Sequence, residues 1–124
     1  SPRDLEVIMV NSALHAIAIE EFRKSDPNFH AQYCKLVEGI SNQVRQIAKE
    51  HPDELDYTSF TESYDRASAE PVLQVVIGTN QNETFVHVYI HQDKYFVVGK
   101  SGAGKKVKTA DEALEVIQQT LSVI

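Results

Sequence analysis

The segment closest to a catalytic motif is a glycine- and lysine-rich run from Gly99 to Lys106. Its spacing fits the phosphate-binding pattern G-x-x-x-x-G-K, in which backbone N–H groups cradle phosphates and the lysine reaches them. Lys106 stands where that pattern needs a Ser or Thr for magnesium, and the next helix is expected only from Thr109, too late to lie under a phosphate. Nucleotide hydrolysis is therefore not expected. A looser anion site is the alternative, built from Lys100, Lys105, Lys106 and Lys108.

Two pairs of side chains are of types that bind metals or catalyse reactions, but their positions do not suit either role. His87 and His91 lie in a segment that alternates like a strand, so they are roughly 13 Å apart and cannot share a zinc ion. Cys34 has His30 one helical turn before it, as a catalytic cysteine–histidine pair would. Its place beside an apolar helical stripe favours a structural thiol at the edge of the core. We therefore predict no catalytic residue, no metal and no cofactor.

The acidic excess of the chain lies in one stretch. Residues 50–70 hold seven acidic side chains and a single basic one, Arg66, while the net charge of the whole chain is −6. The stretch lacks the ligand order of a calcium loop. Acids around aromatic anchors suit a basic protein surface, because charge steers the encounter and rings supply buried area. The candidate contacts are Asp53, Glu54, Asp56, Tyr57, Phe60, Glu62, Tyr64 and Asp65. The alternative is a solvated linker.

The helices expected before this stretch follow from apolar periodicity. Acidic residues behind Pro2 predict a helix that runs to about Lys24 and is apolar on most sides, with a strand over Glu6–Val10 as the alternative. A helix apolar on most sides is central in the core or shared with a partner. A second, amphipathic helix is predicted over residues 27–51, in which Gly39 marks a close crossing with the first helix.

After the acidic stretch, apolar residues recur with the short period of β-strands instead of the period of a helix. Strands are predicted over 72–77, 84–91 and 94–99, and the short loops between them indicate an antiparallel meander. A Gln92-Asp93 loop places Tyr89 opposite Phe96. One face of the sheet then carries Phe85, His87, Tyr89, Phe96 and Val98. That face suits a partner or a dimer mate, unless the acidic connector folds over it.

These elements predict one domain over residues 1–124 with a two-layer α+β fold. Its order is α-α-β-β-β-α, with a three-stranded antiparallel meander packed on helices. Its parts are a helical pair (2–51), a partly helical acidic connector (52–70), an antiparallel sheet (72–99), a basic loop (100–108) and a helix that a capping box opens (109–123).

The composition of the chain limits the classes of protein to which it can belong. The chain is 42% hydrophobic and 24% charged, as is usual for a globular domain, and its single cysteine excludes an internal disulfide. The most apolar run, Val7–Ile19, is shorter than the roughly 20 residues that span a membrane and has no signal-peptide features, so we expect a cytoplasmic protein with no membrane contact. The acidic balance argues against nucleic acid as a partner.

The function predicted from these observations is non-catalytic protein–protein binding. The chain is expected to be a small acidic inhibitor, immunity-type or adaptor protein that occludes a basic partner. His87, Tyr89 and Phe96 either extend the acidic contact surface or form a homodimer interface. One alternative is an anion or nucleotide-phosphate binding module that uses Gly99–Lys108. The other is a structural homo-oligomer built on the first helix and the sheet face.

Overall fold

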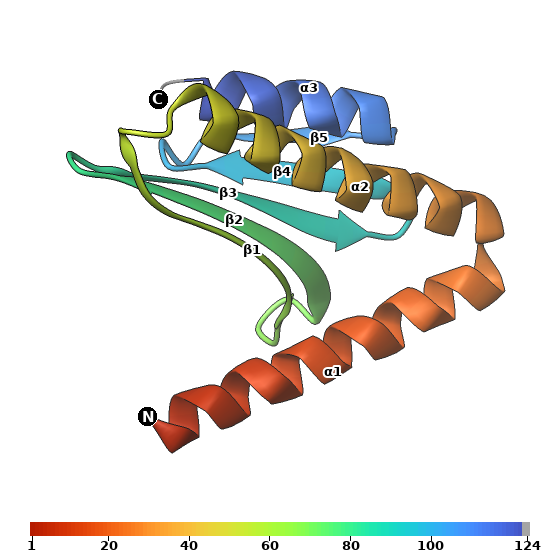
Figure 1. The fold of residues 1–124 in the computed structure, drawn as a ribbon. Coiled ribbons are helices and arrows are strands. Elements are labelled where there is room, and N and C mark those ends of the chain that lie inside the picture. Colours follow the sequence, from red (N-terminus) through yellow and green to blue (C-terminus); the bar gives the residue numbers. More distant parts are fainter. Residues whose placement is uncertain (123–124) are drawn as a thin grey trace.

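The computed structural model describes residues 1–122, in which helices cover one face of a five-stranded antiparallel sheet (Figure 1). The helices are α1 (Pro2–Ser25), α2 (Pro27–Glu50) and α3 (Ala110–Leu121). The strands are β1 (Leu55–Asp65), β2 (Glu70–Thr79), β3 (Glu83–His91), β4 (Lys94–Gly99) and β5 (Gly104–Val107). Each strand pairs with the next in the chain, in the order β1-β2-β3-β4-β5. The predicted α+β fold with an antiparallel meander is confirmed, and the meander has five strands.

Two segments expected to lie outside the sheet belong to it. The acidic connector predicted over residues 52–70 contains β1, so its partly helical reading is wrong. Its Thr and Ser residues are poor helix formers, and β-branched Thr fits a pleated strand well. The basic loop predicted over residues 100–108 contains β5, in which Lys106 pairs with Phe96 of β4. Both segments are edge strands, and an edge strand needs a neighbour on one side only.

Each helix starts within one residue of its predicted first residue. Ser1 caps α1, its hydroxyl accepting from the Asp4 backbone N–H in a capping box, so the strand alternative over Glu6–Val10 is wrong. Asp26 ends α1 and caps α2 by accepting from the Phe29 N–H at 3.1 Å. The last helix ends at Leu121, and the predicted end at residue 123 lies outside the described residues.

The core lies between the sheet and the pair α2 and α3. Alternate residues of β2, β3 and β4 point toward these helices and are fully buried, for example Val75 and Val88. Leu36 from α2 and Ile117 from α3 meet them, and the Phe29 ring stacks on Tyr95 with centroids 5.3 Å apart. Each large aliphatic side chain buried in this way contributes about 1.5–3 kcal/mol.

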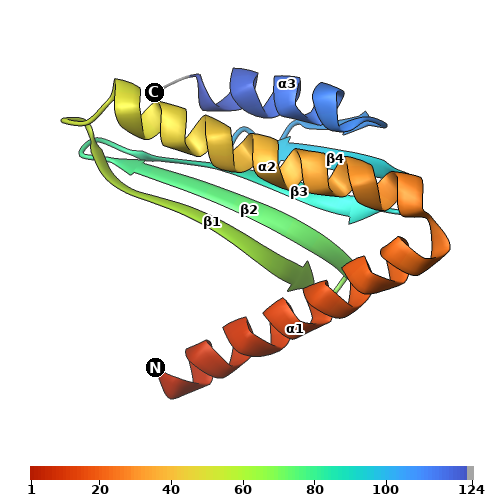
Figure 2. The same cartoon turned by 45° about the vertical axis from the view of Figure 1, so that its right-hand side comes forward.

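Gly39 marks a close crossing, but of α2 with α3 rather than with α1. A Cβ atom added to Gly39 would lie 2.5 Å from Cδ1 of Leu114. The predicted crossing with the first helix is therefore wrong. Figures 1 and 2 show α2 and α3 side by side over the sheet, which is the arrangement that this close approach permits.

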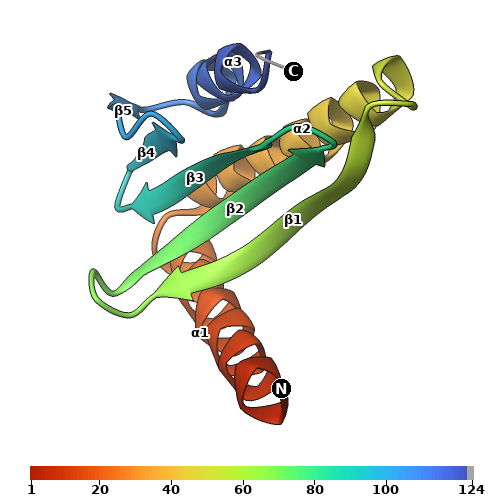
Figure 3. The same cartoon turned by 90° about the vertical axis from the view of Figure 1, so that its left-hand side faces the viewer.

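The first helix is not central in the core. Its C-terminal half packs beside the core through Ile19 and Phe22, whereas Leu5 and Met9 in its N-terminal half are 59% and 64% exposed. In all three views this half projects away from the body of the domain (Figures 1–3). Within residues 1–122, none of the helices combines the length and apolarity needed to cross a bilayer.

We expect Gly39→Val to lower the free energy of unfolding by about 1–3 kcal/mol, because the added side chain overpacks the crossing against Leu114. Chemical denaturation measures this loss. In a Leu114→Ala background the same substitution should cost clearly less, since the methyl groups that it meets are gone. Equal losses in both backgrounds would show that the close crossing is not the cause.

Candidate functional site

The face of the sheet opposite α2 and α3, here called the open face, carries a row of aromatic side chains. Phe85, His87 and Tyr89 follow one another on β3, and Phe96 on β4 pairs with Tyr89. Ring centroids along the row are 5.0, 6.3 and 6.5 Å apart. All four side chains are half-buried, although no helix within residues 1–122 lies over this face of the sheet (Figure 3). The register predicted from the Gln92-Asp93 loop is confirmed.

The acidic segment does not cover this face. As β1, it extends the plane of the sheet beside β2, so the alternative in which the connector folds over the aromatic row is wrong. Burial lowers the pKa of His87 below its usual value of about 6.5, which leaves the ring neutral near pH 7. The row is therefore a neutral, mostly apolar strip at the middle of the open face.

Glycines let two aromatic rings lie across neighbouring strands. A Cβ atom on Gly78 would overlap the ring of Tyr57, and one on Gly104 would overlap the ring of Phe96. Because glycine has no side chain, both rings lie directly over its backbone. The rings therefore spread over the open face instead of standing out from it, and they widen its apolar area.

A shallow hollow of about 480 Å³ opens at one end of this face. Its lining combines apolar side chains with acidic and basic ones: Asp65, Ser68, Glu70, Tyr89, His91, Lys94, Phe96, Val98 and Lys106. The acids come from the β1–β2 end and the lysines from β4 and β5. Nδ1 of His91 lies 3.6 Å from Oε2 of Glu70, so the two attract each other when the imidazole is protonated. The hollow is therefore apolar inside, acidic on one side and basic on the other.

The structure divides the predicted acidic and aromatic contacts into separate groups. Asp65, Tyr89 and Phe96 line the same hollow, so the fold brings these three predicted contacts together. Phe60 packs against the core, and Glu62 pairs with buried Leu73 on the helix side of the sheet.

The remaining predicted contacts lie along or before β1. Asp53 and Glu54 precede the strand, and Asp56 is exposed near its start. Tyr57 lies at the far end of the open face, where its hydroxyl donates to Glu83. Tyr64 is half-buried and, by alternation, shares the side of Glu62.

The four lysines of the anion alternative do not converge. Lys106 pairs with Phe96 and faces the open side, whereas Lys105 pairs with buried Val97 and faces the other side. Lys100 turns to β3 and donates from Nζ to the Glu83 carbonyl oxygen at 2.6 Å. Lys108 follows β5 at the start of the turn into α3. This arrangement gives an anion no point at which the four ammonium groups meet.

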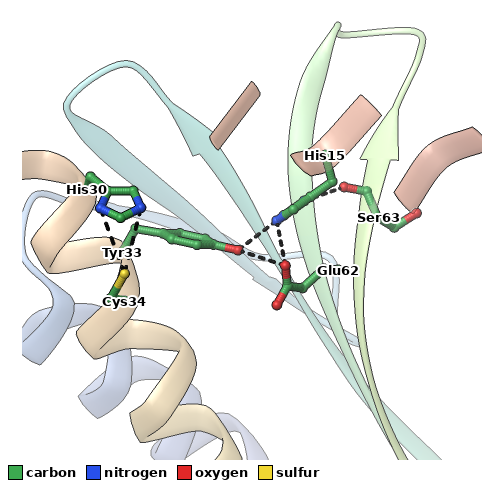
Figure 4. Close-up of polar contacts among 6 residues, drawn as sticks. All are labelled: His15, His30, Tyr33, Cys34, Glu62 and Ser63. Carbon is green, nitrogen blue, oxygen red and sulfur yellow. Dashed lines mark hydrogen bonds and ion pairs between the residues drawn. The ribbon is translucent and has the colours of Figure 1, made fainter. Parts of the chain in front are cut away.

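A polar cluster that the sequence did not reveal joins α1, α2 and β1 (Figure 4). His15 on α1 is 1% exposed, and its Nδ1 lies 2.7 Å from the Ser63 carbonyl oxygen of β1. Its Nε2 lies 2.6 Å from the Tyr33 hydroxyl and 3.3 Å from Oε2 of Glu62. Because a carbonyl oxygen only accepts, Nδ1 donates to Ser63. The single O–H of Tyr33 is shared between Nε2 of His15 and Oε2 of Glu62, which lies 3.3 Å from the hydroxyl oxygen.

This cluster is suited to holding α1 rather than to chemistry on a substrate. The ring of His15 and that of Tyr33, which is 5% exposed, are closed off from solvent. Neither side chain lines the hollow on the open face. Each bond joins two different elements of the fold, and a buried bond left without its partner costs about 1–3 kcal/mol. The cluster therefore fixes α1 at the outer edge of β1.

Cys34 and His30 lie outside this cluster on α2 (Figure 4). Cys34 is exposed, so the expected thiol at the edge of the core is wrong, because the residue faces away from the sheet. Its sulfur lies 3.9 Å from Nδ1 and 3.8 Å from Nε2 of His30. A sulfur almost equally distant from both nitrogens lies beside the ring and not in line with either N–H.

Comparisons of the chain with protein-family models, curated proteins and solved structures gave no match. Within residues 1–122 no three His, Cys, Asp or Glu side chains are grouped so that they could hold a metal ion. The open face is thus the candidate functional site on its geometry alone, because it combines a neutral aromatic row with a hollow between charges of opposite sign.

We expect His15→Leu to lower the free energy of unfolding by about 1–3 kcal/mol, because it leaves the Tyr33 hydroxyl and the Ser63 carbonyl without their shared partner. Denaturation measures the loss, and amide exchange in α1 should quicken most. His30→Leu is the matched control and should change stability by less than about 0.5 kcal/mol. Similar losses in the two variants would contradict the role given to the cluster.

We expect stability to fall as the pH rises above about 10. Burial raises the pKa of Tyr33 and of Tyr95, so both phenols stay protonated in the folded protein while unfolded tyrosines ionise near pH 10. Their contribution is full below that pH and is lost above it. Thermal melts from about pH 8 to about pH 11 measure the decline, and Tyr33→Phe and Tyr95→Phe should each make it shallower. An unchanged slope in both variants would contradict this origin.

Proposed function

We propose that this protein is a non-catalytic binding domain whose open face takes up a basic surface of another protein. The observation that supports this most directly is the row of Phe85, His87, Tyr89 and Phe96, which no helix of the described part of the chain covers. Aromatic side chains are enriched at protein interfaces because they bury a large area with few rotatable bonds.

The shape of the face favours a protein surface over a small molecule. The hollow between Asp65 and Lys106 is shallow, and the apolar strip continues beyond it along β3 to Phe85. Small ligands are usually enclosed in a deep cleft, whereas protein partners bury extended, flatter patches. Tyr57 and Phe96 lie flat over glycines and lengthen this patch across the sheet.

The charge of the β1 side favours a basic partner. Asp53, Glu54 and Asp56 are exposed beside this edge of the sheet, and Asp65 and Glu70 stand at the near side of the hollow. Opposite charges steer two proteins into register and raise the association rate at low salt. Lys94 and Lys106 border the far side, so the partner is expected to be basic where it meets β1 and neutral or acidic near β5.

Binding of this kind acts by covering the partner. A domain that carries an apolar row and an acidic edge on one surface can block an active site or a nucleic-acid site of a basic protein, as an inhibitor or an immunity-type protein would. It can equally hold that protein in a complex, as an adaptor would. The mechanism in each case is steric and electrostatic occlusion, with the aromatic row as the anchor.

We expect a tagged chain to retain a basic protein from an extract of its native source at low salt and to release it as salt rises, because exposed charges are screened. Retention should fall in the Asp53→Ala, Glu54→Ala, Asp56→Ala triple variant. It should fall further in Tyr89→Ala with Phe96→Ala, which removes the anchor. Mass spectrometry of the eluate at each salt step identifies and quantifies the retained protein.

The matched control removes three exposed acids from helices instead: Glu21→Ala, Glu38→Ala and Glu115→Ala. It changes the net charge by the same amount and leaves the open face and its acidic edge intact. Retention of the same protein by the control, and its loss from the other two variants, supports the proposal. Equal losses in the two triple variants would reduce the effect to net charge and contradict a site beside the acidic edge.

A further inference from the structure

The charged side chains at the hollow of the open face lie in one row across the sheet. Asp65 of β1 pairs with Glu70 of β2. His91 of β3 pairs with Lys94 of β4, and its Nδ1 lies 3.6 Å from Oε2 of Glu70. The row therefore passes from two acids through a histidine to a lysine, and all four side chains line the same hollow of about 480 Å³.

The neighbouring row supplies the apolar part of the hollow and a second lysine. Tyr89 of β3 pairs with Phe96 of β4, and Phe96 pairs with Lys106 of β5. The Phe96 ring reaches over β5, since a Cβ atom added to Gly104 would overlap it. Two aromatic rings thus lie between the acids of β1 and β2 and the lysine of β5.

The charges at the hollow are not neutralised by ion pairs. Within residues 1–122, none of Asp65, Glu70, Lys94 and Lys106 forms an ion pair with a lysine, an arginine or a carboxylate of the chain. Neighbouring strands are about 4.8 Å apart, so the backbones of Glu70 on β2 and Lys94 on β4 are roughly 10 Å apart. These two side chains and that of Asp65 are half-buried, and burial of an unpaired charge is unfavourable. A ligand that carries both a cation and an anion would satisfy both sides of the hollow.

We propose that the hollow takes an arginine side chain of the protein that covers the open face, together with an acidic residue beside it. The guanidinium group meets the carboxylates of Asp65 and Glu70 and packs on the Tyr89 ring. The acidic residue meets the ammonium groups of Lys94 and Lys106. This assignment rests on the proposed function, because the arginine belongs to the partner described there.

The chemistry of the acidic side favours arginine over lysine. A guanidinium group is planar, so it stacks on an aromatic ring while its N–H groups form paired hydrogen bonds with a carboxylate. It is also hydrated more weakly than an ammonium group and enters a half-buried site at a lower cost. The hollow offers both contacts together, because Tyr89 lies on the strand next to Glu70.

The two lysines explain why an acidic residue belongs to the same ligand. A cation alone would be repelled by Lys94 and Lys106, which line the far side of the hollow. In an extended segment, residues two apart point to the same face and lie roughly 6.6 Å from each other. An arginine and an acidic residue at this spacing can therefore reach the two sides of the hollow at once.

Nuclear magnetic resonance titration of the isotope-labelled chain tests the assignment with blocked amino acids. N-acetyl-arginine methylamide should shift the backbone amide signals of Glu70, Tyr89 and His91, with a dissociation constant in the millimolar range expected for one side chain. N-acetyl-lysine methylamide has the same charge and should bind at least about threefold more weakly, because it neither stacks nor forms the paired hydrogen bonds. N-acetyl-citrulline methylamide keeps the shape without the charge and should shift none of these signals up to roughly 50 mM.

A pair of matched variants assigns the shifts to the acids of the hollow. Asp65→Asn with Glu70→Gln keeps the size of both side chains and removes their charge, so it should abolish the shifts caused by the arginine compound. Glu38→Gln with Glu115→Gln removes two exposed acids from α2 and α3 and should leave the shifts unchanged. Circular dichroism and thermal melts check that both variants keep the fold.

Blocked tripeptides test the acidic neighbour. Arg-Ala-Glu should bind about two- to fivefold more tightly than Arg-Ala-Gln, which is the gain expected from one exposed ion pair. Lys94→Gln with Lys106→Gln should remove this difference. An equal affinity of the two tripeptides for the unchanged chain would overturn the role given to the lysines.

The arginine assignment is overturned if the arginine compound shifts no signal at the hollow up to roughly 50 mM, or if the lysine or citrulline compound shifts them equally. Retention of a basic protein from an extract is a separate readout. A protein retained equally by the unchanged chain and by Asp65→Asn with Glu70→Gln would leave the proposed function standing and overturn the arginine. Arginine-specific shifts in a chain that retains no protein would support the arginine site and contradict the proposed function instead.

Discussion

The burial of one face of the sheet under two helices is the constraint on which the rest of the structure depends. Residues of β2, β3 and β4 alternate, so every second side chain enters the same core and the others must point the opposite way. Gly39 lets α2 and α3 approach closely enough to cover that face together. Because these two helices cover the core, α1 packs only at its border, and none of the helices described within residues 1–122 covers the opposite face of the sheet. The open face and the projecting α1 both result from this division.

The attachment of α1 shows how a helix outside the core is held. Ile19 and Phe22 provide apolar contact near its C-terminus, but its middle is fixed by the polar contacts of His15 with Tyr33 and Ser63. Such contacts are directional, and they satisfy a backbone carbonyl at the outer edge of β1 that would otherwise be unpaired. The same contacts cover part of that edge against other strands. The helix is thus positioned by hydrogen-bond geometry more than by buried area.

How much could be predicted from the sequence depended on whether the relevant contacts were local. The pairing of Tyr89 with Phe96 follows from alternation and a two-residue loop, and both features can be recognised in the sequence. Strand β1 was missed because its exposed Thr and Ser residues show no apolar alternation, and β5 because it has only four residues. The interpretation of β1 as a connector also assigned Glu62 and Asp65 to one contact surface. In the structure these two residues lie on opposite faces of the strand, and only Asp65 lines the hollow. The contacts of His15 lie 18 and 48 residues away, so no local pattern could indicate them.

The positions of the aromatic row and of the acids within the sheet have a consequence for binding. The row lies on β3 and β4, which pair with each other and with β2 and β5, so neither strand is at an edge of the sheet. The exposed Asp53, Glu54 and Asp56 lie before or at the start of β1, which is an edge strand. A partner on the open face would therefore meet apolar rings at the centre of the contact and acids at its border. Protein interfaces commonly have such an apolar centre and a polar rim, because the rim excludes water from the contacts that it surrounds.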